Sequence, residues 1–282
     1  MNKPARLVGL AAVVGLLIVP SSLAVSAQAA STLPTLTVTV SDSSIAVAGT
    51  VQSGAANVVM NAATGSKEPS PALFLLKPGV TVAEVDAYLK TNMAPKDPNT
   101  TGKYGSIVFD DEASPGKTTE AQTYLQPGTY VALNGAGNSS AKWPTTSFTV
   151  AAAASPVSLP APAATEQSID FGFRGPSTLH DGELVRIENA GYVVHMDLAF
   201  PVKNEAGAKK VVKALLTGKE KGLEKLVAGA PVNFAGPLSN GAYQQETISA
   251  KPGIYVQVCF MQTQDGRSHT RLGMERIIKI VK

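Results

Sequence analysis

The stretch Pro252–Met274, PGIYVQVCFMQTQDGRSHTRLGM, contains a cysteine, a histidine and a methionine, the three residue types that supply thiolate, imidazole and thioether ligands to metals. It contains the only cysteine, Cys259, with His269 ten residues later and Met274 five residues after that. The chain has only three histidines, and a second imidazole could come from His195. Two His, one Cys and one Met form the ligand set of a type 1 copper site, so these four residues are candidate copper ligands.

The bulk composition favours an exported, β-rich protein. The chain has 282 residues, a length typical of about two domains, and 44% of them are hydrophobic, enough for packed cores. Only 16% are charged, while Gly, Ala, Ser, Thr, Val and Pro are plentiful. The formal net charge of +3 favours neither nucleic-acid binding nor a strong attraction to membranes.

Residues 1–30 have the three parts of a secretory signal peptide. Lys3 and Arg6 form a basic start, Leu7 to Pro20 is apolar, and small residues lead to Ala27-Gln28-Ala29. The apolar run is shorter than a membrane span, and no other long apolar run follows. The sequence therefore predicts a secreted or extracytoplasmic protein with no membrane span after cleavage.

The lone cysteine has several possible roles in such a protein. With one cysteine the chain cannot form an internal disulfide. Cys259 could then be a reactive thiol, a site of intermolecular pairing, a metal ligand or a buried core residue.

The remaining sequence predicts two β-rich domains joined by a linker. Short alternating or apolar runs, separated by Gly, Ser and Pro, predict strands throughout residues 31–150 and again through 165–282. Residues 151–164, AAAASPVSLPAPAA, have the composition of an extended linker. Helical spacing of apolar residues predicts one short helix after Pro78-Gly79 and another within Asn204–Gly229.

The two segments also share residues at a constant spacing, so LQPGTYVAL lies over AKPGIYVQV. Positions 125 residues apart carry the same residue in several pairs: Phe109 and Phe234, Gly116 and Gly241, Pro127 and Pro252, Gly128 and Gly253, Tyr130 and Tyr255. This spacing favours a duplicated domain over chance similarity between strands. At least seven short strands per segment predict an all-β fold of two tandem Greek-key β-sandwiches with short helical excursions.

Two segments of the second domain resemble the cupredoxins, the blue copper domains. ENAGYVVHM, Glu188–Met196, resembles the strand and turn that carry the first copper histidine of that family. Pro252–Met274 resembles its last two strands and ligand loop. The resemblance implies a cupredoxin-like fold with His195, Cys259 and His269 as equatorial ligands and Met274 as the axial ligand of one type 1 copper. More loosely, the chain resembles secreted actinobacterial proteins whose sequences end in a similar His-to-Gly-Met segment.

The first domain cannot build this site. Residues 31–150 contain neither His nor Cys, with Asn134 at the position of Cys259 and, approximately, Met60 at that of His195. Trp143, the only tryptophan, is interpreted as closing the end of the sandwich, with a surface contact as the alternative. The acidic run Asp110–Glu112 could bind a cation but is interpreted as a solvated turn. His180, before an Asp-Gly turn, is interpreted as a surface residue.

Residues 203–225 are rich in lysine. Seven lysines stand against three glutamates in this segment, which is interpreted as the solvated face of a helix. The alternative is a docking surface for an acidic redox partner or an anionic component of the cell envelope.

The leading functional hypothesis is an exported cupredoxin-like protein that binds one copper in its second domain and transfers single electrons. Two alternatives stay open: a metal-free secreted binding or structural module, and copper sequestration without electron transfer. Because the sequence offers no nucleotide-binding motif, no serine-hydrolase elbow and no further His cluster, we expect a protein that is not an enzyme.

Overall fold

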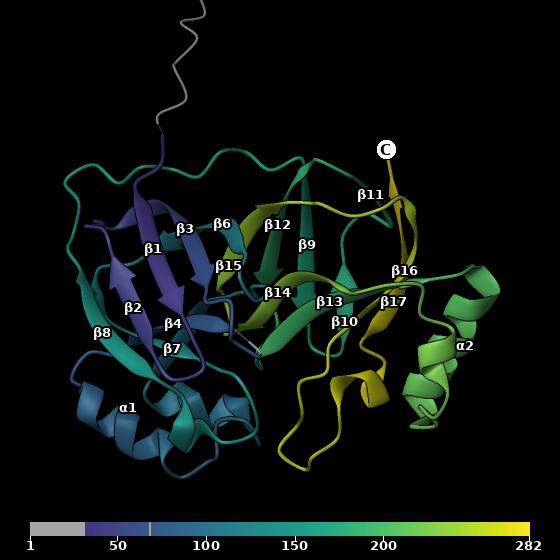
Figure 1. Ribbon diagram of the computed structural model, residues 1–282, viewed down its shortest axis with the longest axis horizontal. Coiled ribbons are helices and arrows are strands. Elements are labelled where there is room, and N and C mark those ends of the chain that lie inside the picture. Colours follow the sequence, from purple (N-terminus) through teal and green to yellow (C-terminus); the bar gives the residue numbers. More distant parts are fainter. Residues whose placement is uncertain (1–31, 68) are drawn as a thin grey trace, which may run out of the picture. The chain divides into compact units, whose positions relative to one another are not determined.

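The computed structural model describes residues 32–67 and 69–282, so the predicted signal peptide, residues 1–30, lies outside the described residues. Three β-sheets form in the described part (Figure 1). Two short α-helices accompany them, α1 (Val82–Leu89) and α2 (Glu205–Thr217). The helix expected after Pro78-Gly79 is thus present as α1, and Thr81 and Glu84 form a capping box at its start.

The first half of the chain is a sandwich of two layers, antiparallel except for the parallel pair β1 and β3. One layer belongs to the largest sheet and contains β1 (Thr35–Val40), β2 (Ile45–Ala48), β3 (Gly54–Ala62) and β6 (Thr118–Leu125). The other layer is a separate sheet of β4 (Pro71–Leu76), β5 (Gly105–Asp110), β7 (Gly128–Asn134) and β8 (Thr145–Val150). Alternate apolar residues of both layers, among them Leu36, Val58 and Tyr130, face inward and form one core.

The second half repeats this arrangement. Its part of the largest sheet contains β9 (Ala164–Ile169), β10 (Gly172–Arg174), β12 (Leu184–Asn189) and β15 (Tyr243–Thr247). The facing sheet contains β11 (Thr178–His180), β13 (His195–Val202), β14 (Val232–Leu238), β16 (Gly253–Val258) and β17 (Glu275–Val281). Phe234, Tyr255 and Ile278 lie in the core between these layers.

The two halves share a continuous sheet of eight strands. Strand β15 of the second half pairs with β6 of the first, placing Gln244 beside Thr123 and Gln245 beside Gln122. Residues 151–163 run between the halves outside the named strands, whereas Ala164, the last residue of the predicted linker, begins β9; Val157 accepts a backbone hydrogen bond from Ala55 in β3 (2.8 Å).

One tyrosine contact occurs identically in both halves. Tyr130 donates its hydroxyl to the carbonyl of Gln126 (2.8 Å), and Tyr255 donates to that of Lys251 (2.7 Å). In each case the tyrosine binds back to the turn that starts its own strand, which stabilises a corner of the sandwich. The contact explains why Tyr recurs at this spacing, while the duplication itself stays a prediction.

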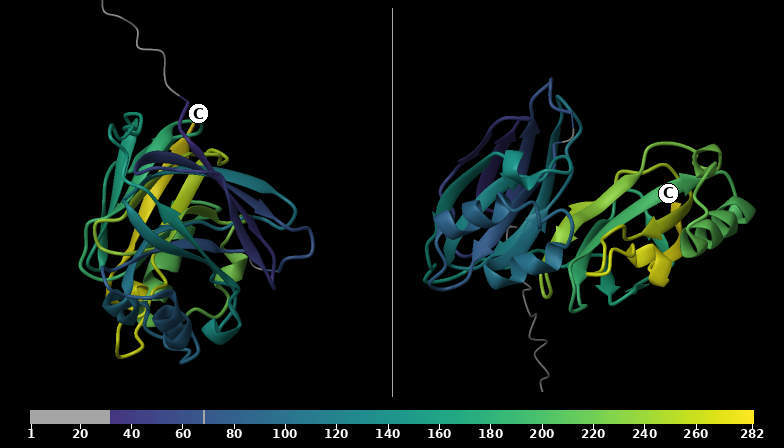
Figure 2. Two further views of the ribbon diagram at one scale, coloured as in Figure 1. Left: turned by 90° about the vertical axis from the view of Figure 1, so that its left-hand side faces the viewer. Right: turned by 90° about the horizontal axis from the view of Figure 1, so that it is seen from below.

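The all-β fold of two tandem sandwiches with short helical excursions agrees with the sequence-based prediction. Helix α2 packs on the five-stranded sheet through Ala208, Val211 and Leu215 (Figures 1 and 2). Within Asn204–Gly229 it ends at Gly218, whose positive φ of 63° favours glycine, and only a short 3-10 turn (Leu223–Lys225) follows. In the described ranges, no helix has the length and apolar character needed to span a membrane.

Candidate metal centre

The sheet topology brings together the three strongest candidate ligands. His195 begins β13, and Cys259 directly follows β16, the antiparallel neighbour of β13. His269 begins a 3-10 turn (His269–Leu272) that leads back into β17, the other neighbour of β16. Two adjacent strands and one loop therefore supply the three side chains at one end of the second sandwich.

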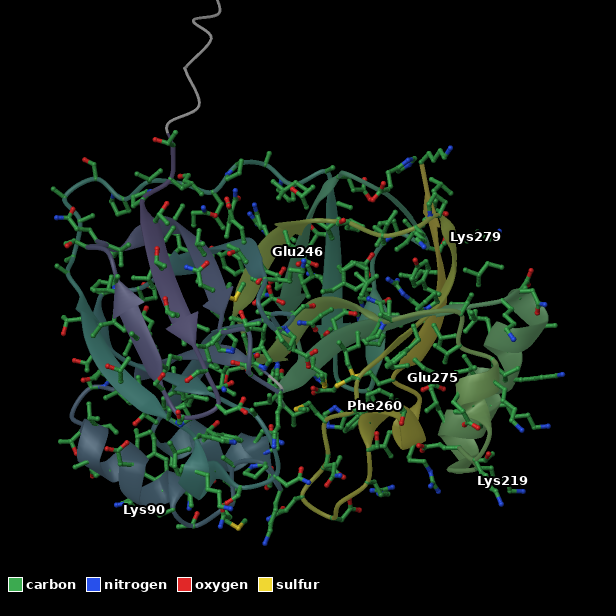
Figure 3. The ribbon with its side chains drawn as sticks, in the orientation of Figure 1. Lys90, Lys219, Glu246, Phe260, Glu275 and Lys279 are labelled. Atoms are coloured by element: carbon green, nitrogen blue, oxygen red, sulfur yellow. The ribbon has the colours of Figure 1, made fainter. Side chains whose placement is uncertain are left out.

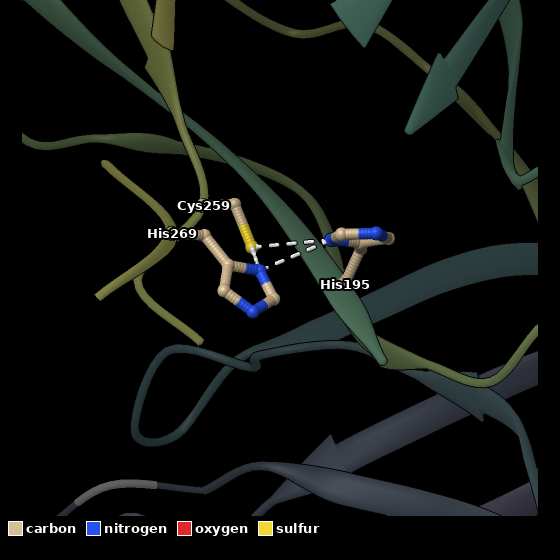
Figure 4. A group of neighbouring side chains, drawn as sticks. All are labelled: His195, Cys259 and His269. Carbon is tan, nitrogen blue, oxygen red and sulfur yellow. Dashed lines mark hydrogen bonds between the residues drawn. The ribbon is translucent and has the colours of Figure 1, made fainter. Parts of the chain in front are cut away.

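The donor atoms of these residues form a small triangle (Figure 4). The Sγ of Cys259 lies 3.3 Å from Nδ1 of His269 and 3.9 Å from Nδ1 of His195. The two Nδ1 atoms lie 3.2 Å apart. All three side chains are buried, none more than 1% exposed. A thiol sulfur and two imidazole nitrogens facing one point are a donor set that suits copper.

Met274 joins this group through its backbone. Its N–H donates to the carbonyl of His269 (3.1 Å), and its carbonyl accepts from the N–H of Cys259 (3.3 Å). The side chain is fully buried. Gly273, with a positive φ of 99°, ends the 3-10 turn just before it. The last predicted ligand is thus tied by hydrogen bonds to two of the others.

The loop from Phe260 to Ser268 is held by its own hydrogen bonds. Gln262 and Ser268 form a β-bridge, and the N–H of Thr263 donates to the carbonyl of Arg267 (2.9 Å). The N–H of His269 donates to the carbonyl of Met261 (2.8 Å). This small hairpin holds His269 opposite Cys259 although nine residues separate them in the sequence.

Asp170 fixes the orientation of His195, and sequence reasoning missed it. Its Oδ1 lies 3.2 Å from Nε2 of His195 and accepts backbone hydrogen bonds from Tyr192 (2.8 Å) and Val193 (3.3 Å). Burial opposes ionisation of Asp170, but these hydrogen bonds outweigh it and hold its pKa below the usual range. An ionised carboxylate only accepts hydrogen bonds, so Nε2 of His195 carries the proton and Nδ1 presents a lone pair.

Burial keeps the ligand atoms uncharged. It raises the pKa of the Cys259 thiol to about 12 and lowers the pKa of His269 to about 4, helped by the nearby His195. Burial also lowers the pKa of His195, against the opposing effect of Asp170. Two neutral imidazoles and a thiol facing one buried point can bind a metal cation once the thiol loses its proton.

Other side chains complete the surroundings. The rings of Phe171 and His269 form a T-shaped contact with the ring centres 5.2 Å apart. From the first half of the chain, Oδ1 of Asn99 accepts a hydrogen bond from the N–H of Val194 (2.7 Å), next to His195. Asp170 and Asn99 lie 25 and 96 residues before His195. No local sequence pattern connects them to the site.

The third histidine, His180, and Asn134 of the first half lie where they cannot contribute to this cluster. His180 lies exposed on β11, with Nδ1 3.2 Å from the carbonyl of Lys282, outside the cluster. In the first half, Asn134 ends β7 where Cys259 follows β16; it is fully buried, accepting from the N–H of Ser70 and donating to the carbonyl of Ser41. Its amide thus satisfies backbone groups at the position where the second half has a thiol.

One interpretation of the sequence is wrong. The acidic run Asp110–Glu112 is not a solvated turn throughout, because Asp110 and Asp111 are only 5% and 4% exposed. Asp110 ends β5, which packs beside β14 of the second half. The contact between the halves buries the two aspartates, and this could not be read from local sequence.

Comparison with solved structures finds copper proteins. One is reduced auracyanin from Roseiflexus castenholzii, with 17% identity over 42% of this chain and 95% of that chain, at a TM-score of 0.25. A Cu-containing nitrite reductase from Thermus scotoductus has 11% identity over 88% of this chain and 68% of that one, also at 0.25. A multicopper oxidase has 11% identity over 88% of both chains, at 0.23.

The fold is cupredoxin-like. The strand order and the placement of His195, Cys259 and His269 at the ends of adjacent elements agree with this description. No protein-family model matches the chain, and no curated protein does. The expectation that the protein is not an enzyme is contradicted by the comparison and is withdrawn, since nitrite reductase and multicopper oxidase are enzymes.

Proposed function

We propose that the chain binds one copper ion through His195, Cys259, His269 and Met274, and exchanges single electrons there. The observation that supports this most is the convergence of one sulfur and two imidazole nitrogens within 3.9 Å of one another. When bound, copper would supply a one-electron couple that no side chain of the cluster has. This ligand set is that of a type 1 site.

Each residue has a role in this proposal that follows from its surroundings. Cys259, fully buried and directly after β16, would bind as the thiolate and provide the path by which an electron leaves the copper. Asp170 holds His195 with Nδ1 facing the site. Backbone hydrogen bonds of the β-hairpin hold His269 in place, so little rearrangement would accompany a change of charge on the copper.

One set of measurements separates this proposal from its two alternatives, copper sequestration and a metal-free module. The protein is loaded with Cu(II), and copper content, visible spectrum and EPR spectrum are compared for the wild type, Cys259→Ser and His180→Ala. We expect one copper per chain and an intense charge-transfer band that Cys259→Ser loses and His180→Ala keeps. Tight Cu(I) binding without a stable Cu(II) form would favour sequestration, and no stoichiometric copper in either state would favour a metal-free module.

We further infer that the lysine-rich segment 203–225 steers an acidic redox partner. In α2 the apolar face packs on the sheet, while Lys209, Lys210 and Lys213 are on the rest of the helix. The same helix contacts the 3-10 turn that carries His269, and Lys219 follows its end (labelled in Figure 3). An anionic molecule docked there would lie close to the cluster.

Ferrocyanide serves as an anionic electron donor for testing this surface. Lys213→Glu should slow reduction of the copper-loaded protein by ferrocyanide at low salt, and added salt should remove the difference. A neutral electron donor is the control. An unchanged rate with ferrocyanide would contradict docking at this segment.

The predicted signal peptide makes an extracytoplasmic location part of the proposal. Residues 1–30 carry the evidence for it, in their basic start, apolar run and small residues before the cleavage site. N-terminal sequencing of the exported protein should find a start near Ala30 or Ser31. A start at Met1 would contradict cleavage.

A further inference from the structure

A cavity of about 250 Å³ lies beside the metal-ligand loop. Its walls come from both halves of the chain. Phe74, Tyr88 and Trp143 of the first half face Phe260, Met261 and Gln262, which directly follow Cys259 (Phe260 is labelled in Figure 3). A concave, mostly apolar space with few polar groups is the usual form of a small-molecule site.

Three of the lining residues from the first half, Phe74, Tyr88 and Trp143, are aromatic. The hydroxyl of Tyr88 is engaged with that of Thr100, and Nε1 of Trp143 donates to the carbonyl of Ala136 (2.7 Å). Both polar groups are therefore already hydrogen-bonded within the protein. These rings can therefore offer a ligand apolar contact and interaction with a π-system.

A buried carboxyl group marks the polar end of the cavity. Asp110 lines it together with Ser70, whose hydroxyl donates to Oδ1 of Asp110 (3.3 Å). Among the described residues, no lysine, arginine or histidine forms an ion pair with Asp110. The next two residues, Asp111 and Glu112, are acidic too, and burial together with their charges raises the pKa of Asp110 well above its ordinary value.

We propose that this cavity binds a small organic amine, with the protonated nitrogen at Asp110 and an apolar or aromatic body between Tyr88, Trp143 and Phe260. Ionising a buried carboxyl group without a counter-charge is costly, and a bound ammonium group supplies the charge that offsets this cost. Aromatic faces stabilise the same cation. The volume admits a molecule of the size of a single-ring amine and not a drug-sized ligand.

This site is distinct from the proposed copper site, although both use the same loop. Phe260 and Met261 line the cavity, while the preceding Cys259 belongs to the metal cluster. Amine binding needs no metal in this proposal, so it is tested on the metal-free protein. Its failure and a failure of copper binding are then separate results.

The only tryptophan of the chain lines the cavity and serves as the probe. Trp143 fluorescence is followed while 2-phenylethylamine or 2-phenylethanol is added to the metal-free protein, and calorimetry checks the stoichiometry. The two molecules share a ring and chain and differ in charge. We expect saturable binding of one amine, at least tenfold tighter than binding of the alcohol.

Two variants separate the cavity from its charge. Asp110→Asn keeps the shape of the side chain and should abolish the preference for the amine. Ala94→Leu adds bulk at a buried wall position, 6% exposed, and should prevent binding of both molecules while leaving Asp110 intact. Circular dichroism and thermal melting establish that each variant is folded.

Three results would overturn the proposal. Equal binding of alcohol and amine would refute recognition of charge, and the absence of saturable binding at millimolar concentrations would refute the site. An unchanged amine preference in folded Asp110→Asn would place the ammonium group elsewhere. If Asp110→Asn does not fold, the comparison of amine with alcohol on the wild type and on Ala94→Leu still decides.

Discussion

Copper binding at pH 8 should release one proton from the protein, and that proton should come from Cys259. Burial raises the pKa of this thiol to about 12, so the thiol is protonated at pH 8 before metal is added. Burial lowers the pKa of His269 to about 4 and also lowers that of His195, so both imidazoles are neutral at pH 8 and can bind copper through the nitrogen that carries no proton. Copper binds the thiolate, and one proton must leave.

The same shift sets the size of the pH dependence. The pKa of about 12 lies about four units above pH 8, so forming the thiolate costs roughly 5 kcal/mol there, which metal binding must offset. The apparent affinity should therefore rise about tenfold for each pH unit between pH 7 and 10. Below about pH 4 protonation of His269 should make the dependence steeper.

Calorimetry with Cu(I) measures the proton directly. Anaerobic titrations in buffers of different ionisation enthalpy give the number of protons released per metal bound. We expect about one for the wild type and for His180→Ala, whose exposed imidazole lies outside the cluster, and none for Cys259→Ser. Release of no proton by the wild type would show that the thiolate is not a ligand, and release of two would show that a protonated imidazole had been displaced.

Three further predictions concern the residues around the cluster. Asp170→Asn should weaken copper binding about 10- to 100-fold in a chelator competition, because an amide holds the N–H of Nε2 of His195 less strongly than a carboxylate does. An unchanged affinity would show that Asp170 does not position the ring. Arg276→Met should lower the free energy of unfolding, measured by urea denaturation, by about 3–5 kcal/mol, because it leaves the fully buried Glu166 without its cation. A loss under about 1 kcal/mol would show that the ion pair contributes little to stability. Burial raises the pKa of Asp197 to about 7, above its unfolded value, so its contribution to stability is complete below about pH 4 and is lost as the pH rises through 7. When the free energy of unfolding in urea is plotted against pH from 4 to 8, Asp197→Asn should therefore give a flatter curve than the wild type. Parallel curves would contradict this.

The convergence of His195, Cys259 and His269 was predictable because each of these candidate ligands stands in a recognisable local sequence pattern. Tyr255 lies on β16, a strand predicted after Pro252 and directly followed by Cys259, and its antiparallel neighbour β13 begins at His195. The small number of candidates narrowed the choice further, since the chain has one cysteine and three histidines.

The supporting contacts were not predictable for the opposite reason. Asp170 reaches His195 across a gap of 25 residues, and an aspartate before a turn is common in any sequence. Asp110 was interpreted as solvated because its neighbours are acidic. It is buried because β5 meets β14, a pairing of elements from different halves that follows from tertiary structure alone.

The most direct test of the central claim is a crystal structure of the copper-loaded protein with anomalous data collected on both sides of the copper absorption edge. The account predicts one anomalous peak, bonded to Sγ of Cys259 and to Nδ1 of both His195 and His269, with Met274 beside it. A peak at the exposed His180 or at the buried carboxylates, or no peak within the cluster, would contradict it.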